Sequence, residues 1–346
     1  MKPNTYSIVP DTVEAEGTSE TLDDFRKEFS IDQEAQIRLV KVAHMRYRHP
    51  DLEEITTFME DFGMTVTQKT EDKVWLRGYS SDQYVYYAEK GERAFLGGTF
   101  EVESFADLEK AVKLPGATKI QELVDAPGGG HLVTVYDPLG FPVNLLYGQT
   151  PAEVSEPPTQ PVVNFVAEKS RKRAFQRFQP GPAAVHKLGH FGMSVTDFPS
   201  QLHFYVTNFN IVPTDYVYVE HGGQKIRVSV FAHIDRGEDF VDHHTFFLSH
   251  GSSNHVHHCS FEVQDYDTQH LGHQWLAKKG YKSVWGIGRH ILGSQIFDYW
   301  WDTTGNMVEH YADGDVVNNK TPINYVVAGD ESLAVWGPEL PKAFLS

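Results

Sequence analysis

Hydrophobic and polar positions along the chain recur in two matching sets. Residues 97–102 and 258–263 both end in Phe-Glu-Val and alternate apolar with polar side chains, which is typical of a strand. A stretch with helical periodicity follows each of them, at 104–112 and 267–280. Each copy therefore predicts a strand followed by a helix.

The same order of elements is repeated on either side of these segments. Lys41-Val-Ala-His44 and Lys187-Leu-Gly-His190 each precede a stretch with helical periodicity, at 50–64 and 196–211. Later, Asp137-Pro-Leu-Gly140 and Asp302-Thr-Thr-Gly305 each predict a tight turn between two strands. We expect an α+β fold of two tandem modules, each built from two βαβββ units that form a curved mixed sheet around a site.

The positions of the repeats divide the chain into five parts. Residues 150–182 are rich in proline and have the composition of a linker. We expect an acidic, loosely ordered extension at 1–35, an N-terminal module at 36–149, a C-terminal module at 183–313 and a C-terminal arm at 314–346. The arm, which contains Trp336, is expected to pack along a module.

Composition limits the partners. The chain has 346 residues, 40% of them hydrophobic, so it is long enough for two modules with a substantial core. The net charge of −17 argues against binding to nucleic acid or to an anionic membrane. The basic run from Lys169 to Arg177 is interpreted as a solvated or interface segment.

Cysteine and apolar runs limit the compartment. Cys259 is the sole cysteine, which excludes an intramolecular disulfide and a multi-cysteine zinc site. No apolar run follows Met1, and no stretch has the length of a membrane span. We therefore expect a cytoplasmic protein.

The C-terminal module carries a candidate metal-ligating residue on each of three predicted strands: His190, His258 and Glu309. Because side chains alternate across a strand, three strands of a curved sheet can direct two imidazoles and one carboxylate to a single point. Two histidines and one carboxylate on one face hold non-haem Fe(II) and leave the opposite face open. The same ligands suit Mn(II).

The segment from Gly288 to Glu309 makes the chain recognisable. His290 precedes Tyr299 by nine residues, and Tyr299 precedes Glu309 by ten. With these spacings the chain resembles the type I extradiol dioxygenases of the vicinal oxygen chelate superfamily, such as the dihydroxybiphenyl, homoprotocatechuate and catechol 2,3-dioxygenases. His243-His244-Thr-Phe-Phe-Leu also resembles the catalytic-histidine strand of that family. The resemblance covers roughly residues 36–313.

The resemblance implies an activity and roles for three further residues. The reaction would be extradiol cleavage of a catechol by O2 at Fe(II), giving a ring-opened semialdehyde or keto acid in aromatic hydrocarbon catabolism. His244 would stand over the O2 site as a general acid. Tyr299 would bond to a substrate oxygen, and His290 would favour the deprotonated catechol.

Several positions depart from the family pattern or compete with the chosen residues. Asp298 stands where the family has an aromatic or aliphatic residue, and it should point away from Tyr299. Strand alternation predicts that His243 and His257 face away from the site, as structural or solvent-facing residues. Residues 213–240 form a longer segment than is usual and are expected to reshape the pocket.

Two other functions remain open from the sequence. One is an α-keto-acid dioxygenase like hydroxyphenylpyruvate dioxygenase, and the other is a metal-free binding module. The position at which relatives that bind carboxylated catechols carry arginine is Trp285, which with Trp300 and Trp301 predicts a preference for apolar substituents. A homo-oligomer is also expected.

The N-terminal module is expected to be a metal-free scaffold. In the alignment of the two repeats, His44 matches His190, but Gly97 stands at the position of His258 and Asn144 at that of Glu309. One imidazole and one amide cannot hold a divalent cation.

Overall fold

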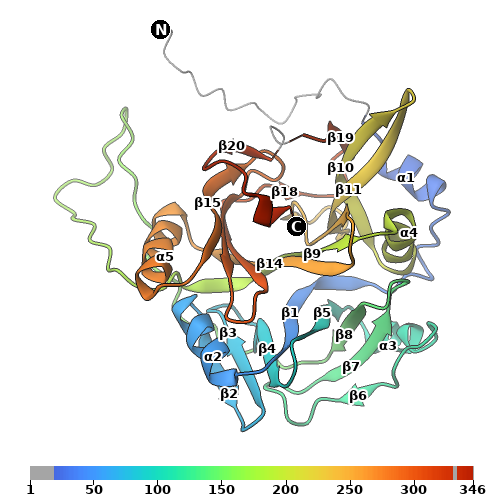
Figure 1. The fold of residues 1–346 in the computed structure, drawn as a ribbon, viewed down its shortest axis with the longest axis horizontal. Helices are drawn as coiled ribbons and strands as arrows, with labels where there is room; N and C mark the ends of the chain where they lie inside the picture. Colours follow the sequence, from blue (N-terminus) through green and yellow to red (C-terminus); the bar gives the residue numbers. More distant parts are fainter. Residues whose placement is uncertain (1–18, 330–332, 346) are drawn as a thin grey trace.

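The computed structural model describes residues 19–329 and 333–345, and they form two modules stacked on one another (Figure 1). The N-terminal module is built on an eight-stranded sheet with the order β2-β3-β4-β1-β5-β8-β7-β6. Its strands are β1 (Leu39–His49), β2 (Thr65–Lys69), β3 (Lys73–Arg77), β4 (Tyr86–Lys90), β5 (Ala94–Val102), β6 (Gln121–Glu122), β7 (His131–Tyr136) and β8 (Pro142–Tyr147).

The C-terminal module repeats this arrangement in a ten-stranded sheet with the order β19-β10-β11-β13-β9-β14-β17-β16-β15-β20. Its strands are β9 (Val185–Val195), β10 (Ile211–His221), β11 (Gln224–Ile234), β13 (Phe246–His250), β14 (His255–Val263), β15 (Ser283–His290), β16 (Ile296–Trp301), β17 (Met307–Ala312), β19 (Asn324–Val327) and β20 (Ala334–Trp336). A small sheet pairs β12 (Val241–Asp242) with β18 (Val316–Val317).

Each half of a module contributes one helix, as the periodicity predicts. The four helices are α2 (Leu52–Asp61), α3 (Phe105–Ala111), α4 (Phe198–Asn208) and α5 (Tyr266–Lys279). Aspartates begin three of them: the carboxylates of Asp51, Asp197 and Asp265 accept hydrogen bonds from backbone N–H groups of the first turn. The expected α+β fold of two modules, each of two βαβββ units, is confirmed.

The strand register shows that the two modules are repeats. In the N-terminal sheet, His44 pairs with Thr99, which in turn pairs with Asn144. In the C-terminal sheet, His190 pairs with Ser260, which pairs with Glu309. The two tight turns also match, since Gly140 and Gly305 both have a left-handed φ, of 85° and 84°.

Both modules contribute to one continuous hydrophobic core. Phe62 lies against Phe261, and its carbonyl accepts a hydrogen bond from His310 Nε2 at 2.7 Å. His49 Nδ1 lies 2.7 Å from Thr304 Oγ1. The C-terminal sheet is therefore fixed on the N-terminal module through buried polar contacts as well as apolar ones.

The N-terminal segment differs from the expected loosely ordered extension. Residues 22–28 form helix α1 (Leu22–Glu28), whose Phe25 is fully buried. Arg26 forms an ion pair of 2.8 Å with Asp235 in the C-terminal module. The expectation was wrong for residues 19–35 because an apolar side chain and an ion pair hold them, while residues 1–18 lie outside the described part.

The chain beyond residue 313 returns to the C-terminal sheet. Strand β19 adds to β10 at one edge, and β20 adds to β15 at the other. The short helix η2 (Lys342–Phe344) follows. The predicted packing of this arm along a module is thus confirmed for its described residues.

Within residues 19–329 and 333–345, no helix is long and apolar enough to cross a membrane.

Candidate metal centre

The structure brings together the three residues that the sequence singles out as ligands. His190 Nε2 lies 3.2 Å and His258 Nε2 lies 3.4 Å from Glu309 Oε2. The two imidazole nitrogens are 3.3 Å apart. Among the described residues these form a cluster whose ligand atoms all lie within 4.8 Å of one another, and all three side chains are buried.

Neighbouring strands position these side chains. His190 is on β9, His258 on β14 and Glu309 on β17, and these strands are adjacent in the sheet. The parallel pairing of β14 with β17 sets Ser260 opposite Glu309, and the antiparallel pairing with β9 sets it opposite His190. The curvature of the sheet then directs the imidazoles and the carboxylate to one point.

Glu309 supplies the observation that bears on the metal. Its side chain is fully buried, and among the described residues its carboxylate meets only the imidazole nitrogens of His190 and His258, at 3.2 and 3.4 Å, and no lysine or arginine. A buried carboxylate is costly unless a cation compensates its charge. Two imidazole nitrogens beside such a carboxylate fit a divalent transition metal.

His258 is oriented by a chain of hydrogen bonds that begins in the C-terminal segment. The carbonyl of Phe344 lies 2.6 Å from His257 Nε2, so this nitrogen carries a proton and donates it. Because burial lowers the pKa of His257 to about 3, the ring is neutral and its Nδ1 is an acceptor. That atom lies 2.8 Å from His258 Nδ1, which therefore donates and leaves His258 Nε2 with its lone pair toward Glu309.

A second chain orients Tyr299. His290 Nδ1 lies 2.8 Å from the carbonyl of Leu333, so it is the protonated nitrogen of this ring. Burial lowers the pKa of His290 to about 4, which keeps the ring neutral. Its Nε2 is then an acceptor for the Tyr299 hydroxyl, 2.9 Å away. Burial and the charge of Glu309 raise the pKa of Tyr299 well above its ordinary value, so the phenol keeps its proton.

His244 lies beside the ligand cluster, with its ring centre 4.1 Å from that of His190. Burial lowers the pKa of His244 well below its ordinary value, and the neighbouring His190 adds to this effect. Its Nδ1 is 3.1 Å from His243 Nδ1, and His243 Nε2 is 2.7 Å from the carboxylate of Asp215. Asp215, His243 and His244 thus form a line of polar contacts that ends at the cluster.

Strand alternation gave the wrong orientation for one of the two histidines. His257 and His258 both line the same cavity, because the register of β14 against β9 shifts between Val256 and His258 and the alternation is lost there. His243 does not line the cavity and is a buried residue held between Asp215 and His244, in agreement with a structural role. Asp298 does face away from Tyr299, and it bonds to His273 and Trp300.

A cavity of about 380 Å³ opens onto the cluster and onto His244, His290 and Tyr299. Its apolar wall comes from Val217, Val228 and Phe231 of the β10–β11 hairpin and from Leu333, Phe344 and Leu345 of the C-terminal segment. The hairpin covers the expected segment 213–240. The contribution of the C-terminal segment had no signal in the sequence, since only the fold brings residue 344 beside residue 258.

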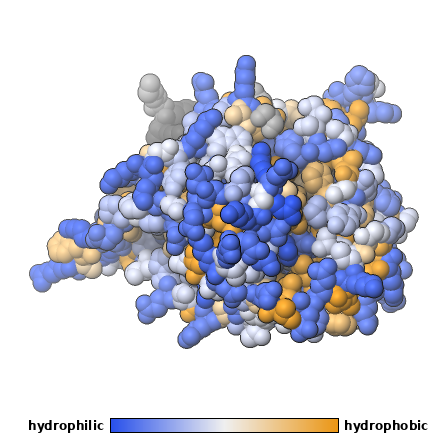
Figure 2. Space-filling view, turned by 60° about the horizontal axis from the view of Figure 1, so that its bottom comes forward, coloured by the Kyte–Doolittle hydropathy of each residue, from blue (hydrophilic) through white to orange (hydrophobic). Residues whose placement is uncertain are grey.

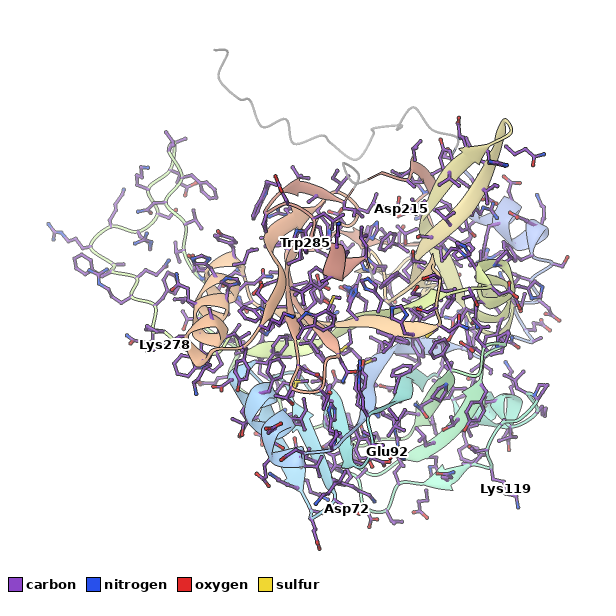
Figure 3. The ribbon with its side chains drawn as sticks, in the orientation of Figure 1. Asp72, Glu92, Lys119, Asp215, Lys278 and Trp285 are labelled. Carbon is purple, nitrogen blue, oxygen red and sulfur yellow. The ribbon has the colours of Figure 1, made fainter. Side chains whose placement is uncertain are left out.

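The three tryptophans do not line this cavity. Trp285 packs against Phe344 without lining the cavity itself, and it donates a hydrogen bond to the carbonyl of Pro338. Trp300 faces away and bonds to Asp298. Figure 3 shows Trp285 and Asp215 on separate parts of the C-terminal module. The tryptophan-based reason for an apolar pocket was therefore wrong, although the wall itself is apolar.

The comparison with known sequences agrees with this geometry. Metapyrocatechase 2 of Cupriavidus necator is 28% identical over 310 residues, which cover 88% of this chain and 91% of the relative. Among solved structures, homoprotocatechuate 2,3-dioxygenase of Arthrobacter globiformis superposes with a TM-score of 0.74 at 19% identity, covering 90% of this chain and 92% of that one. The chain is thus similar in sequence to a metapyrocatechase and shares the fold of a homoprotocatechuate 2,3-dioxygenase.

Other comparisons widen the range of relatives with this fold. The extradiol enzyme of Brevibacterium fuscum in complex with 3,4-dihydroxyphenylacetate has a TM-score of 0.72 at 19% identity and covers 90% of this chain and 93% of its own. A Mn(II)-bound glyoxalase of Novosphingobium aromaticivorans has a TM-score of 0.72 at 16% identity, covering 89% and 94%. No family model matches the sequence. The fold of the homoprotocatechuate 2,3-dioxygenases thus also occurs in a glyoxalase that binds Mn(II).

Proposed function

We propose that this protein cleaves the ring of a catechol beside the diol, using O2 and one Fe(II) held by His190, His258 and Glu309. One observation carries the proposal: the two imidazoles and the carboxylate converge at the wall of a cavity that also exposes His244 and Tyr299. The relation to metapyrocatechase supports the same reaction class. Bound Fe(II) would supply the redox centre at which the catechol and O2 meet.

Iron is the proposed metal, and Mn(II) is the alternative. Two imidazoles and a carboxylate suit either ion. The glyoxalase that shares this fold is bound to Mn(II), which supports manganese as the alternative. Metal content and activity after anaerobic loading with each ion separate the two.

Tyr299 and His290 are proposed to control the proton of the substrate hydroxyl. Since the Tyr299 hydroxyl donates to His290 Nε2, its oxygen keeps lone pairs that can accept a hydrogen bond from a catechol hydroxyl. His290 is held by the carbonyl of Leu333 and cannot rotate away without losing that bond. The pair therefore provides a path by which the substrate proton moves toward His290.

His244 is proposed as the general acid, with Asp215 and His243 behind it. The carboxylate of Asp215 accepts a hydrogen bond from His243 Nε2, which makes His243 Nδ1 an acceptor. His244 Nδ1 then donates to His243 Nδ1, so His244 Nε2 has a lone pair with which it can take up a proton during the reaction and return it to the ring-opening intermediate. Asp215 and His243 act through His244 and are positioning residues.

The cavity favours a neutral substrate. Among the described residues that line it there is no lysine, arginine, aspartate or glutamate. A carboxylated catechol would bring a charge into this cavity without a basic partner, which is unfavourable. We therefore propose a catechol whose substituents are apolar or neutral.

Oxygen uptake by anaerobically loaded protein tests the proposed reaction. Catechol, alkylated and carboxylated catechols and 4-hydroxyphenylpyruvate would be compared, with the ring-opened product followed by its yellow absorbance. We expect uptake with catechols, most strongly with uncharged ones. Uptake with 4-hydroxyphenylpyruvate alone would assign the chain to the α-keto-acid dioxygenases, and binding without uptake would make it a binding module.

Glu309→Gln tests the metal site in the same assay. The amide removes the one anionic ligand, so the variant should lose most of its bound metal and its activity. Glu262→Gln is a matched control, because Glu262 lies on the neighbouring strand β14 and bonds to His186 outside the cluster. Normal metal content in Glu309→Gln would remove Glu309 from the ligand set.

We also propose that the protein acts in the cytoplasm and assembles with copies of itself. The cytoplasm is reducing, which suits Fe(II) and the single buried thiol of Cys259. The assembly is supported by apolar side chains that are exposed on the segment between the modules.

A further inference from the structure

The segment between the two modules contains a projecting loop, residues 162–178, which we call the linker arm (Figure 1). It forms neither helix nor strand, yet side chains hold it in a defined shape. Asn164 Oδ1 accepts a hydrogen bond of 2.7 Å from the backbone of Arg171, whose Nε donates to the carbonyl of Val162. Val162 N donates in turn to Gln176 Oε1 at 2.9 Å. The arm is thus shaped by its own contacts.

Large apolar side chains are exposed on the linker arm. Phe165 is 65% exposed, Val166 95% and Phe175 80%. Three more lie beside them: Val162, Val163 and Phe178. Figure 2 shows the projection at the left, with apolar surface next to hydrophilic side chains. An exposed apolar patch of this kind marks a surface that another molecule covers.

The charge of the linker arm is opposite to that of the rest of the chain. It contains five basic residues and one acidic residue, a net charge of +4, whereas the whole chain has −17, which leaves −21 elsewhere. Within residues 19–329 and 333–345, no ion pair includes any of the five basic side chains. The body of the protein is therefore complementary to the arm in charge.

We propose that the linker arm docks on the body of a second copy of this chain. In a twofold dimer the contact occurs twice, once for each arm. An aromatic side chain buries about 150–250 Å² when it is covered. Three phenylalanines and three valines on each of two arms thus contribute on the order of 1,000 Å², which approaches the area of a specific interface of about 1,200–2,000 Å².

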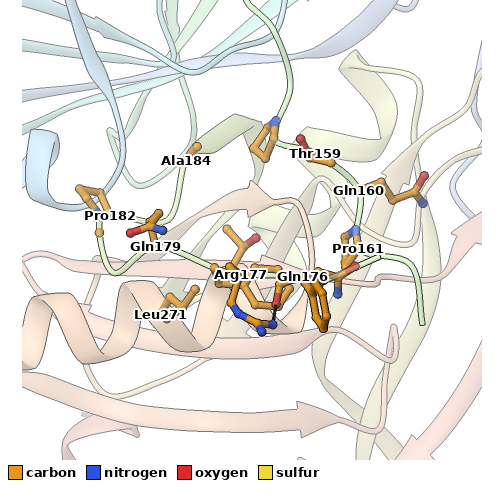
Figure 4. Close-up of a pocket in the computed structure, with 14 residues that line it drawn as sticks. Thr159, Gln160, Pro161, Gln176, Arg177, Gln179, Pro182, Ala184 and Leu271 are labelled. Carbon is orange, nitrogen blue, oxygen red and sulfur yellow. Dashed lines mark hydrogen bonds between the residues drawn. The ribbon is translucent and has the colours of Figure 1, made fainter. Parts of the chain in front are cut away.

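A cavity at the base of the linker arm gives the second copy a place to enter. It has a volume of about 460 Å³ and lies between residues 158–161 and 175–182, over Leu271 of α5 (Figure 4). Phe175 and Phe178 line it together with several prolines. An apolar side chain of the second copy can fill this space and fix the arm.

Light scattering of the full-length protein after size-exclusion chromatography tests the docking. Phe165→Ser with Val166→Ser should shift the wild-type oligomer to a smaller species, because these side chains are 65% and 95% exposed within one chain. Val124→Ser with Phe240→Ser is the matched control, since those residues are 77% and 68% exposed outside the arm, and it should leave the mass unchanged. Lys169→Glu with Lys172→Glu should also weaken the assembly.

Cross-linking identifies the surface that the arm touches. Cys259 is buried, so a cysteine placed by Val166→Cys is the one accessible thiol of the chain. A photoreactive group on it should join two copies of the chain, with the second attachment point on the acidic body. A monomeric wild-type protein, an oligomer unaffected by the arm variants, or binding of the monomer to anionic vesicles through the arm would each overturn the proposal.

A separate observation concerns Gln295, which directly precedes β16. The side chain is 1% exposed, and neither its Nε2 nor its Oε1 has a hydrogen-bond partner among the described residues. It lines the same cavity as His244, His290 and Tyr299. A buried amide without partners is costly, so its two polar atoms suit a ligand that bonds to them.

We infer that Gln295 selects catechols that carry a third neutral hydrogen-bonding group, such as a further hydroxyl; this inference rests on the proposed function. A carboxamide offers one donor group and one acceptor, which match a hydroxyl that both donates and accepts. A carboxylate would use only the donor side. Gln295 belongs to the β15–β16 turn, whereas the apolar wall comes from β10, β11 and the C-terminal segment, so a single ring can contact both.

Anaerobic binding to Fe(II)-loaded protein tests this role of Gln295. The dissociation constants of 1,2,3-trihydroxybenzene and 3-methylcatechol would be measured by titration. Gln295→Met keeps the size of the side chain and should weaken binding of the trihydroxy compound about 3- to 10-fold, the loss of one neutral hydrogen bond. Binding of 3-methylcatechol should stay the same or improve.

Two further variants test whether the preference depends on the position of the Gln295 amide or on the packing of the core. A Cβ on Gly314 would stand 3.1 Å from Gln295 Cγ and 3.3 Å from its Nε2, so Gly314→Ala should displace the amide and reduce the same preference. Gln269→Met on α5 removes a buried amide outside the cavity and should lower stability without changing the preference. Equal effects on both ligands in Gln295→Met would overturn the role. Changed binding without any ring cleavage would refute the proposed reaction and leave the role of Gln295 intact.

Discussion

His257 and His258 are joined through their Nδ1 atoms, 2.8 Å apart, although they are consecutive residues of one strand. Alternation would set such neighbours on opposite faces of the sheet. The register shift in β14 removes the alternation at this point. The first histidine thereby fixes the tautomer of the second, and the carbonyl of Phe344 fixes the tautomer of the first.

Removing His257 should weaken metal binding. His257→Ala takes away the acceptor for His258 Nδ1, so the His258 ring can rotate and its Nε2 is no longer held toward Glu309. The loss of such an outer contact reduces metal affinity about 10- to 100-fold. Competition with a chelator, with the metal content read by elemental analysis, measures this change. His270→Ala on the exposed face of α5 is the control, and an unchanged affinity in His257→Ala would contradict the hydrogen-bond chain.

His244→Asn should slow turnover and spare the metal. The side chain is not one of the three clustered residues proposed as ligands, and an amide cannot take up a proton and supply it as an imidazole does. Loss of a general acid costs about 10²–10⁴-fold in rate. Steady-state kinetics and metal analysis of the same preparation provide the test. Loss of metal would mean that His244 is a ligand, and unchanged turnover would remove it from the mechanism.

Asp215→Asn probes the line of contacts behind His244. The amide keeps the shape of the side chain but lacks the charge that holds the proton on His243 Nε2. We expect a fall in kcat of about 10-fold, at the lower end of general-acid effects, with KM and metal content unchanged. A purely structural role would instead change KM, stability and metal content together.

The fold and the clustering of His190, His258 and Glu309 could be predicted because both depend on local patterns and on the repeat. The helices begin at Asp51 and Asp265 where the periodicity starts, and Gly140 and Gly305 turn the chain at matching places. The spacing of His290 and Tyr299 before Glu309 reflects the antiparallel pairing of β16 with β17, in which Tyr299 lies opposite Glu309.

What the sequence could not predict depends on irregular or distant contacts. A β-bulge adds one residue to a strand without a distinct sequence pattern, so the orientation that alternation predicts for His257 was wrong. Phe344 reaches the cavity only because the C-terminal segment returns across the sheet after β20. Helix α1 is ordered by Phe25 and by the ion pair of Arg26 with Asp235, 209 residues away.

The N-terminal module should not bind a metal, and the metal content of a His44 variant tests this. Its ring is buried, neither nitrogen has a partner among the described residues, and burial lowers its pKa well below the ordinary value. Asn144, at the position that matches Glu309, bonds instead to Thr134 and to the carbonyl of Leu96. We expect one metal ion per chain in the wild type and in His44→Ala alike.

His44→Ala should instead lower the free energy of unfolding, by about 2 kcal/mol, because it opens a space in the core. His44→Leu should recover most of this loss, since an apolar side chain fills the space and leaves no unpaired nitrogen. Denaturant unfolding and elemental analysis give both quantities. Two metal ions per wild-type chain, or a loss of metal in a folded His44→Ala protein, would show a second site.

His49 should make stability depend on pH between about 6.5 and 4. The ring is fully buried between Tyr86 and Thr304, and burial lowers its pKa to about 4, whereas a histidine in the unfolded chain titrates near 6.5. Above pH 6.5 the ring is neutral in both states. As the pH falls from there toward 4, only the unfolded chain takes up the proton, and the folded state loses stability. At pH 5 this loss amounts to about 2 kcal/mol relative to pH 7.5.

His49→Gln keeps polar atoms near Tyr86 and Thr304 but cannot titrate. The difference in unfolding free energy between wild type and His49→Gln, measured with urea after chelation of the metal, should therefore shrink by about 2 kcal/mol from pH 7.5 to pH 5. A difference that stays constant across this range would show that His49 does not cause the pH dependence.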